Sequence, residues 1–442
     1  MRFALRMLLV GSLAFTAMAC GPNDNNGNDG SRDGATDATM RNDGFTYDLP
    51  ALTDAVDHYL CLGMGTEVTG TVLSPNGQDP IFGAVVYVTH GEPAAISPGV
   101  ACDSCAVPPD ALGFAVTGAD GTFSIPHAFD EGGAVNVVIQ KGRFRRIVRL
   151  TTSGCNAQML TNAQTSLPGA SGTDVSFPRI LVAGTVNDDI ATVLTRIGIT
   201  EVEMMDGCRR ATTAADIMAC PLGQLLADST RIAQYNMILL PCGALGNFHT
   251  WQVLPPNVIT GLQGFLQAGG RLYSSDLSYG VIQRPFPDAF TFAGGTTLSQ
   301  GGNDPADVGL GGSRTTPRSY EGVIDDPDLL AWMSARGALL PNNHVSLTEF
   351  LNPWGAIDRA GASATTWVHA SVPWHDASGA IIPDADHPLT VEATYRGTNG
   401  SGCGRVVFTS YHTNSTTTGP LTPQERVLEW LIFELGGCVT PG

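Results

Sequence analysis

The hydrophobic pattern of this sequence changes near residue 178, and this change restricts the fold more than any other feature. Before it, apolar residues occur in short β-branched runs separated by turn residues, as at 67–72 and 84–89. After it, fully apolar runs such as 178–184 alternate with segments of helical spacing such as 256–268. Short strands between turns are typical of antiparallel sandwiches, whereas strands that alternate with helices form parallel sheets covered on both faces.

The pattern therefore predicts two folded units of different class. We expect a small antiparallel β-sandwich at 51–155 and a three-layer α/β unit at 177–442, with a long insertion at about 284–320. Residues 156–176 are rich in Ser, Thr, Gly and Asn and are expected to be a linker.

The composition argues against nucleic acid as a partner and against a disordered chain. The formal net charge is −18, so the long-range field repels the phosphates of nucleic acid. With 43% hydrophobic and only 14% charged residues, the chain is expected to fold rather than to stay disordered.

Residues 1–19 predict an export signal, because arginines precede an apolar stretch that ends in small residues. Cys20 follows Ala19 directly, and this arrangement resembles a bacterial lipoprotein signal. The resemblance implies lipid on Cys20, and Gly21 after it implies sorting to the outer membrane. The spacing of Ala17 and Ala19 also suits ordinary signal peptidase, which would leave Cys20 as a free thiol.

The segment 20–50 is expected to be a flexible tether that follows the signal. Asn, Asp and Gly dominate it, so it has little to bury against the entropy of ordering. The apolar stretch of the signal is shorter than the ~20 residues that a membrane-spanning helix needs. The expected partner is thus a membrane reached through lipid, in the envelope of an exporting cell.

Three motifs in the first unit occur in the order of a known family. They are 68–72, 80–88 and 117–125, and Asp120-Gly121 in the third predicts a hairpin turn. Together they resemble the carboxypeptidase regulatory-like domain, with an insertion at about 90–113. The resemblance implies a transthyretin-like β-sandwich that is a stalk or accessory module without catalysis.

The cysteines are expected to form disulfides, because exported chains meet an oxidising compartment. Four lie in the first unit and allow three connectivities there. In the second unit, a local pair and a pair between the last strand and last helix are plausible, which leaves Cys242 unpaired. The disulfide candidates are Cys61, Cys102, Cys105, Cys155, Cys208 with Cys220, and Cys403 with Cys438.

The second unit resembles the class I glutamine amidotransferase-like superfamily. The resemblance rests on 237–243, the helix at 256–268, the strand entry at 269–272 and the late segment 404–412. It implies a flavodoxin-like α/β sandwich. In active members, the first turn supplies an oxyanion donor, a Cys stands at a strand-to-helix elbow and a late His-x-Glu completes the triad.

Mapped onto this sequence, the resemblance predicts a site that has lost its nucleophile. Cys242 lies in the first turn, Ser275 or Asp276 occupies the elbow in place of Cys, and His412 fits the late histidine. Asn414 replaces the Glu that would orient it. A nucleophile needs an adjacent base, and a histidine base needs an orienting partner. We therefore expect no catalysis, with an exported ester or amide hydrolase that uses Ser275 or Cys242 with His412 as the alternative.

No cofactor or metal is expected from the remaining motifs. Two segments, Trp374-His375-Asp376 and Asp384-Ala385-Asp386-His387, mix imidazole and carboxylate groups that could bind a metal. Because no pair has the spacing of one helix face, both segments are expected to be solvated loops. A sugar-binding surface would require that Trp354, Trp367 and Trp374 be exposed together. The preferred function is thus a non-catalytic envelope lipoprotein with an unknown ligand.

Overall fold

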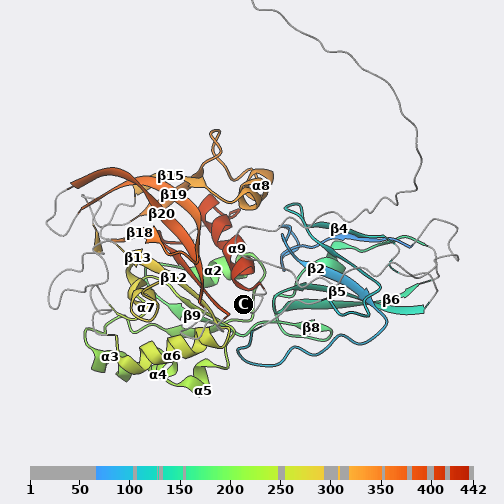
Figure 1. Ribbon diagram of the computed structural model, residues 1–442, viewed down its shortest axis with the longest axis horizontal. Coiled ribbons are helices and arrows are strands. Elements are labelled where there is room, and N and C mark those ends of the chain that lie inside the picture. The colour runs from blue at the N-terminus through green and yellow to red at the C-terminus, as the bar shows by residue number, and fades with distance from the viewer. Residues whose placement is uncertain are drawn as a thin grey trace, which may run out of the picture. The chain divides into compact units, whose positions relative to one another are not determined.

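The computed structural model describes most of the chain after residue 65, and all structural statements below concern that part. The signal, the tether, Cys20, Cys61, Cys105, Cys155, Asn414 and Cys438 lie outside it. The described ranges are 66–102, 107–126, 128, 133–152, 156–246, 254–292, 307–308, 318–350, 354–375, 381–395, 403–413 and 419–437. The protein is multidomain, with several β-sheets and with helices concentrated in the second half (Figure 1).

The amino-terminal part contains two sheets that share one buried core. One sheet has the order β4-β1-β7, and the other has the order β3-β2-β5-β6-β8. Alternate residues of the central strands, such as Val86, Val137 and Ile139, are fully buried because successive side chains of a strand face opposite sides. The strands are β1 (Val68–Thr71), β2 (Val85–Thr89), β3 (Gly113–Val116), β4 (Thr122–Ile125), β5 (Gly133–Lys141), β6 (Phe144–Thr152), β7 (Gln158–Met159) and β8 (Val175–Ser176).

Asp120-Gly121 forms a turn, but the expected hairpin is wrong. Strand β3 before the turn pairs with β2, whereas β4 after it pairs with β1 in the other sheet. The turn therefore connects the two sheets. Gly121 has a φ of +70°, and a Cβ on it would lie 2.6 Å from the carbonyl oxygen of Val72, so glycine is required there for space as well as for conformation.

The expected linker at 156–176 is also wrong, because this segment completes both amino-terminal sheets. Strand β7 runs parallel to β1, and β8 pairs with β6. Between them, helix α1 (Asn162–Thr165) begins with a capping box, in which the side chains of Thr161 and Gln164 each accept a hydrogen bond from the other residue's backbone N–H. The polar segment 156–176 thus contributes edge strands to both sheets and is not an unstructured linker.

The carboxy-terminal part is built on a nine-stranded sheet in the order β10-β9-β11-β12-β21-β20-β19-β15-β16. The first five strands are parallel and the rest are antiparallel, so the expectation of an all-parallel sheet is wrong for half of it. The parallel strands are β10 (Glu203–Asp206), β9 (Ile180–Gly184), β11 (Met237–Leu240), β12 (Arg271–Ser275) and β21 (Gly404–Thr409). The antiparallel ones are β20 (Ile381–Tyr395), β19 (Ala364–His375), β15 (Arg318–Ile324) and β16 (Val345–Phe350).

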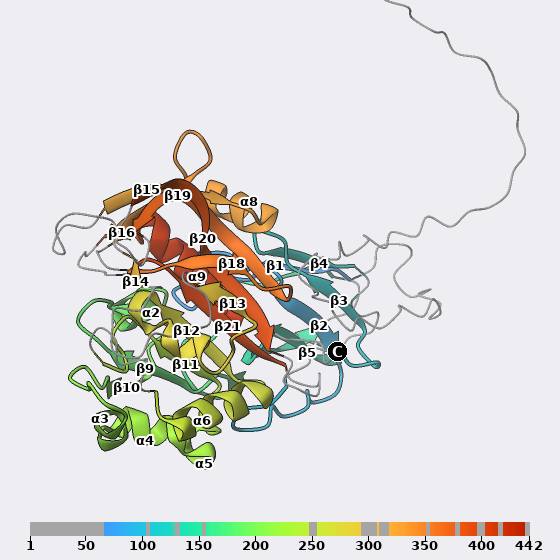
Figure 2. The same ribbon diagram turned by 60° about the vertical axis from the view of Figure 1, so that its left-hand side comes forward.

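Helices cover both faces of the parallel strands. Val182 and Leu239 belong to one buried cluster with α2 and α9, whereas Leu181 and Ile238 belong to the other with α4 and α6. Figure 2 shows α3 to α6 gathered beside β9 to β12. The helices are α2 (Ile190–Arg196), α3 (Ala214–Ala219), α4 (Pro221–Ala227), α5 (Ser229–Ile232), α6 (Pro256–Gln267), α7 (Gly280–Gln283), α8 (Pro327–Ala335) and α9 (Pro423–Leu435).

The expected insertion at 284–320 contains strand structure where the chain is described. Strand β13 (Phe290–Phe292) pairs with β18 (Ile357–Ala360), and β14 (Asp307–Val308) pairs with β17 (Trp354–Gly355). Strand β15 begins at Arg318 and extends to Ile324. The helix that follows this strand, α8, begins at Pro327 with Asp326 as its N-cap.

The two parts pack through one continuous core, and their described residues belong to a single compact unit. The Phe82 ring stacks on Trp430 of α9 with 5.3 Å between centroids. Lys141 of β5 contacts Glu434 of α9 at 2.7 Å with both side chains buried. The contact between Lys141 and Glu434 joins residues that lie 293 positions apart in the sequence.

A disulfide between Cys102 and Cys403 also joins the two parts. This bond corrects two expectations, because Cys102 was assigned a partner within the first unit and Cys403 was paired with Cys438. Cys208 is bonded to Cys220, the local pair that the sequence suggested. Cys242 is free and buried.

Candidate functional site

The candidate site lies where three neighbouring parallel strands end. Strands β11, β12 and β21 are adjacent in the sheet, so the residues after their carboxyl ends meet at one edge. Cys242 follows β11, Asp276 follows β12 directly and His412 follows β21. The site therefore follows from the topology of the sheet rather than from closeness in sequence.

Asp276 occupies a strained elbow. Its φ is +44°, in the left-handed region that non-glycine residues rarely adopt, and it begins a short 3₁₀ turn that runs to Ser278. The Ser278 hydroxyl donates to the Pro241 carbonyl at 2.7 Å and accepts from the Ala244 amide at 3.2 Å. The elbow after β12 is thus held against the turn after β11.

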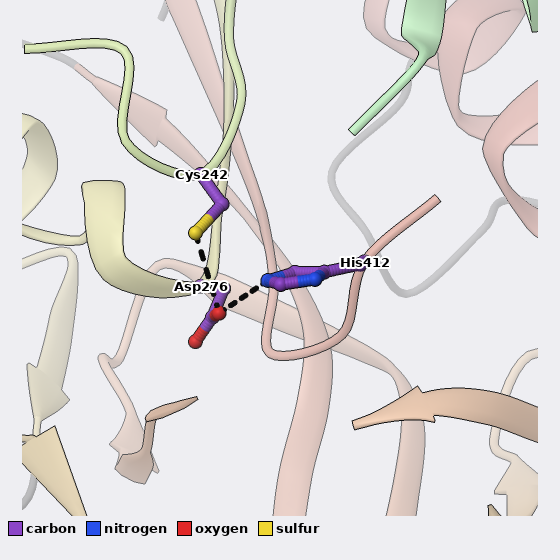
Figure 3. Close-up of side chains that lie close together, drawn as sticks. All are labelled: Cys242, Asp276 and His412. Carbon is purple, nitrogen blue, oxygen red and sulfur yellow. Dashed lines mark hydrogen bonds and ion pairs between the residues drawn. The ribbon is translucent and has the colours of Figure 1, made fainter. Parts of the chain in front are cut away.

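The carboxylate of Asp276 contacts both other members of the cluster (Figure 3). Its Oδ2 lies 2.5 Å from Nε2 of His412 and 3.4 Å from Sγ of Cys242. The three side chains are almost completely buried, with residue exposures of 1% for Cys242, 1% for Asp276 and 3% for His412. Their nearest donor atoms all lie within 4.8 Å of one another.

A second carboxylate, that of Asp188, holds the backbone around this cluster. Its Oδ2 accepts from the Cys242 amide at 2.9 Å and from the Ser275 hydroxyl at 2.7 Å, and its Oδ1 accepts from the Thr413 amide at 2.6 Å. These three residues follow or end β11, β12 and β21. Asp188 thus ties together the same three strand ends as the cluster above.

Burial and charge determine the protonation of the cluster. Burial, followed by the nearby Asp276 carboxylate, raises the pKa of the Cys242 thiol to about 12. Burial by itself lowers the pKa of His412. The charges of Asp276, Cys242 and Asp188 and the hydrogen bond with Asp276 act in the opposite direction, and they raise this pKa well above its usual value. At neutral pH the group therefore consists of a thiol, a carboxylate and an imidazolium, and it lacks the thiolate that nucleophilic cysteine chemistry requires.

The structure brings together only some of the site residues that the sequence suggested. Cys242, Asp276 and His412 converge, and Asp276 rather than Ser275 stands at the elbow. The Ser275 hydroxyl donates to Asp188 instead of to the imidazole. Sequence reasoning missed Asp188 as a site residue because Asp188-Asp189 reads as a helix cap, a role that Asp189 fills for α2.

Two other sequence hypotheses are corrected by the structure. His387 lies on β20 and is 5% exposed, so it is not in a solvated loop, and His369 on β19 contacts Asp386 at 2.6 Å and Asp325 at 3.1 Å. Trp367 is 1% exposed and packs against Trp430, so it belongs to the core and not to a sugar-binding surface. The side chains of Trp354, Trp374 and His375 lie outside the described part.

A cavity of about 580 Å³ lies elsewhere, near the opposite ends of the parallel strands. Arg179 and Asn236, which precede β9 and β11, line one side, and Arg143 and Ser97 of the amino-terminal part line the other. Its polar groups are already engaged: Arg143 donates to the Ser97 carbonyl at 2.6 Å, and Asn236 donates to the Gly99 carbonyl at 2.7 Å. The first bond lies within the amino-terminal wall and the second joins the two walls, and no member of the buried cluster lines the cavity.

Comparison with known proteins finds weak structural neighbours. No family model matches the sequence, and no curated protein matches it. A ThuA-like protein from Bacteroides uniformis is 9% identical, with a TM-score of 0.32 over 57% of this chain and 89% of that one. The exo-β-1,4-mannosidase Op5Man5 from Opitutaceae bacterium strain TAV5 is also 9% identical, with a TM-score of 0.25 over 60% of this chain and 36% of that one.

In the part of the chain that the structure describes, no helix has the length and apolar character that crossing a bilayer requires.

Proposed function

We propose that the protein is an exported, lipid-anchored envelope protein with a non-catalytic binding or structural role. In this proposal the amino-terminal part is a carboxypeptidase regulatory-like sandwich that acts as a stalk or docking module. The carboxy-terminal part is a glutamine amidotransferase-like unit of flavodoxin-like arrangement that binds a ligand of the envelope or its surroundings. The single observation that carries the proposal is the position of the Asp276 carboxylate between Cys242 and His412.

The position of Asp276 argues against acyl transfer by its neighbours. A catalytic Cys or Ser needs a base that can take its proton, and an imidazolium bound to a carboxylate at 2.5 Å has no free lone pair for that purpose. The Ser275 hydroxyl is directed to Asp188, and the Cys242 thiol is held protonated by burial. Each potential nucleophile therefore lacks its partner.

Two observations support export. The sequence begins with a segment of signal type that ends at Cys20. The disulfides Cys102–Cys403 and Cys208–Cys220 are of the kind that persists in oxidising compartments. Mass spectrometry of the mature amino terminus tests the anchor: a diacylglyceryl group on Cys20 is expected, and an unmodified or uncleaved terminus would refute it.

A second candidate function, an exported ester or amide hydrolase, is favoured by the closeness of the Cys242 sulfur and the His412 imidazole, which lie within 4.8 Å at the carboxyl edge of the sheet. A shift of Asp276 would allow these two groups to meet. This candidate requires turnover that depends on both residues.

The two candidates are distinguished by assaying the mature chain with p-nitrophenyl esters and with glutamine as an amide donor. The variants are Cys242→Ala, Ser275→Ala and His412→Ala, and His369→Ala is the control for loss of a histidine–carboxylate contact elsewhere. We expect that neither the unmodified chain nor any variant hydrolyses these substrates faster than buffer does. Turnover that His412→Ala and either Cys242→Ala or Ser275→Ala abolish, and that His369→Ala keeps, would overturn the non-catalytic function.

A further inference from the structure

We propose that Cys242, Asp276 and His412 bind one divalent transition-metal ion, and that Zn²⁺ suits this donor set best. This inference does not depend on the proposed function, since a metal there would serve either a structural or a binding role. No sequence motif indicates this site, because the three residues follow the ends of three strands and show no ligand spacing.

The chemistry of the three donors selects the kind of cation. A thiolate sulfur, an imidazole nitrogen and a single carboxylate oxygen form a mixed soft and borderline set, which favours Zn²⁺ over the oxygen-seeking Mg²⁺ and Ca²⁺. Among the described residues, this is the one group of three or more His, Cys, Asp and Glu side chains whose donor atoms converge in this way. The set is also fully buried, unlike the acidic groups that are common on surfaces.

The spacing of the donor atoms is close to what a tetrahedral ion requires. With bonds of 2.0–2.3 Å, ligand atoms around tetrahedral zinc lie about 3.3–3.8 Å apart. The distance of 3.4 Å between Sγ of Cys242 and Oδ2 of Asp276 already falls in this range. The 2.5 Å between that oxygen and Nε2 of His412 has to open by roughly 1 Å, which side-chain rotation can supply.

Neighbouring groups already orient the ligands, as outer-shell partners do in known metal sites. The Gly355 amide donates to Oδ1 of Asp276 at 2.7 Å, which leaves Oδ2 for the metal. The Asn187 amide lies 3.5 Å from Sγ of Cys242, where it can donate to a thiolate. Gln424 donates to the backbone carbonyl of His412 at 2.7 Å and fixes the segment that carries the imidazole.

The test uses the full chain, stripped of metal by a chelator and then titrated with Co²⁺ and with Zn²⁺. We expect one tightly bound ion per chain and a thiolate-to-cobalt charge-transfer band. Cys242→Ser should abolish the charge-transfer band, and His412→Gln should weaken binding by at least 10-fold. His369→Gln, which removes a histidine that also contacts two carboxylates, should leave both unchanged.

X-ray absorption of the zinc-loaded wild-type chain keeps the test decisive if a variant does not fold. One sulfur at about 2.3 Å with nitrogen or oxygen at about 2.0–2.1 Å is expected. Binding without a sulfur ligand, a charge-transfer band that persists in Cys242→Ser, or no bound ion in the wild type would each overturn the proposal. None of these results depends on hydrolysis, so they are independent of the function proposed above.

Discussion

Lys141, the single lysine of the sequence, allows a sharp prediction about the contact between the two parts of the chain. Its ammonium group lies 2.7 Å from Glu434, and the two side chains are 5% and 3% exposed. Removing one partner of a buried ion pair takes away a charge that stabilises the other, which costs about 3–5 kcal/mol. We therefore predict that Lys141→Met lowers the free energy of unfolding by about that amount.

Urea unfolding followed by tryptophan fluorescence measures this change. With a slope of roughly 2–3 kcal/mol per molar urea, the midpoint should fall by about 1–2 M. The double variant Lys141→Met with Glu434→Met should recover most of the loss, because two apolar side chains replace the pair without leaving a buried charge.

An exposed ion pair provides the control for this experiment. Arg149 contacts Glu92 at 2.5 Å, but these side chains are 49% and 69% exposed, so Arg149→Met should lower the stability far less than Lys141→Met does. The reasoning would be refuted if Lys141→Met cost no more than Arg149→Met. It would also fail if the double variant were as unstable as the sum of its two single changes.

Three further predictions concern the same compact unit. Burial and the Asp79 carboxylate raise the pKa of Glu429 from 4.5 to about 8, although Arg426 opposes this shift. Between these two pH values the folded chain therefore keeps a proton on Glu429 that the unfolded chain releases. Stability should thus fall as pH rises from about 4.5 to 8, by up to roughly 1.4 kcal/mol per unit, and Glu429→Gln should flatten this slope in unfolding measured across pH. Replacing both Cys102 and Cys403 by Ser should lower the thermal midpoint, with a loss of roughly 2–5 kcal/mol; an unchanged midpoint by calorimetry would contradict the cross-link. Gly142→Ala should prevent stable folding, because its Cβ would lie 1.6 Å from the Gly436 carbonyl oxygen, whereas Gly133→Ala, which has open space, should be tolerated in circular dichroism.

The alternation of strands and helices between 178 and 275 was predictable because it depends on local periodicity. The apolar run that became β9 and the amphipathic segment that became α6 bury the residues that their spacing indicated. The antiparallel half of the sheet was not predictable in this way. Strands β19 and β20 are 12 and 15 residues long, and the direction in which they pair is decided by distant partners rather than by their own pattern.

The candidate site was predictable as a set of positions but not as a geometry. Mapping the family resemblance onto the sequence makes Cys242, Asp276 and His412 candidates, and the structure brings them together. Which of Ser275 and Asp276 stands at the elbow depends on a backbone angle that no local signal encodes. The role of Asp188 depends on three contacts across the sheet, and the bond between Cys102 and Cys403 spans 301 residues, so neither could be derived from spacing.

The bond between Cys102 and Cys403 also changes how the molecule would transmit force. A pull applied between the first strand and the last helix would pass through this cross-link, so most of the residues between the two cysteines would be spared extension. A protease cut within that interval would leave both fragments attached until a reductant is added. In single-molecule stretching, the contour length released should therefore increase by close to 300 residues when the bond is reduced.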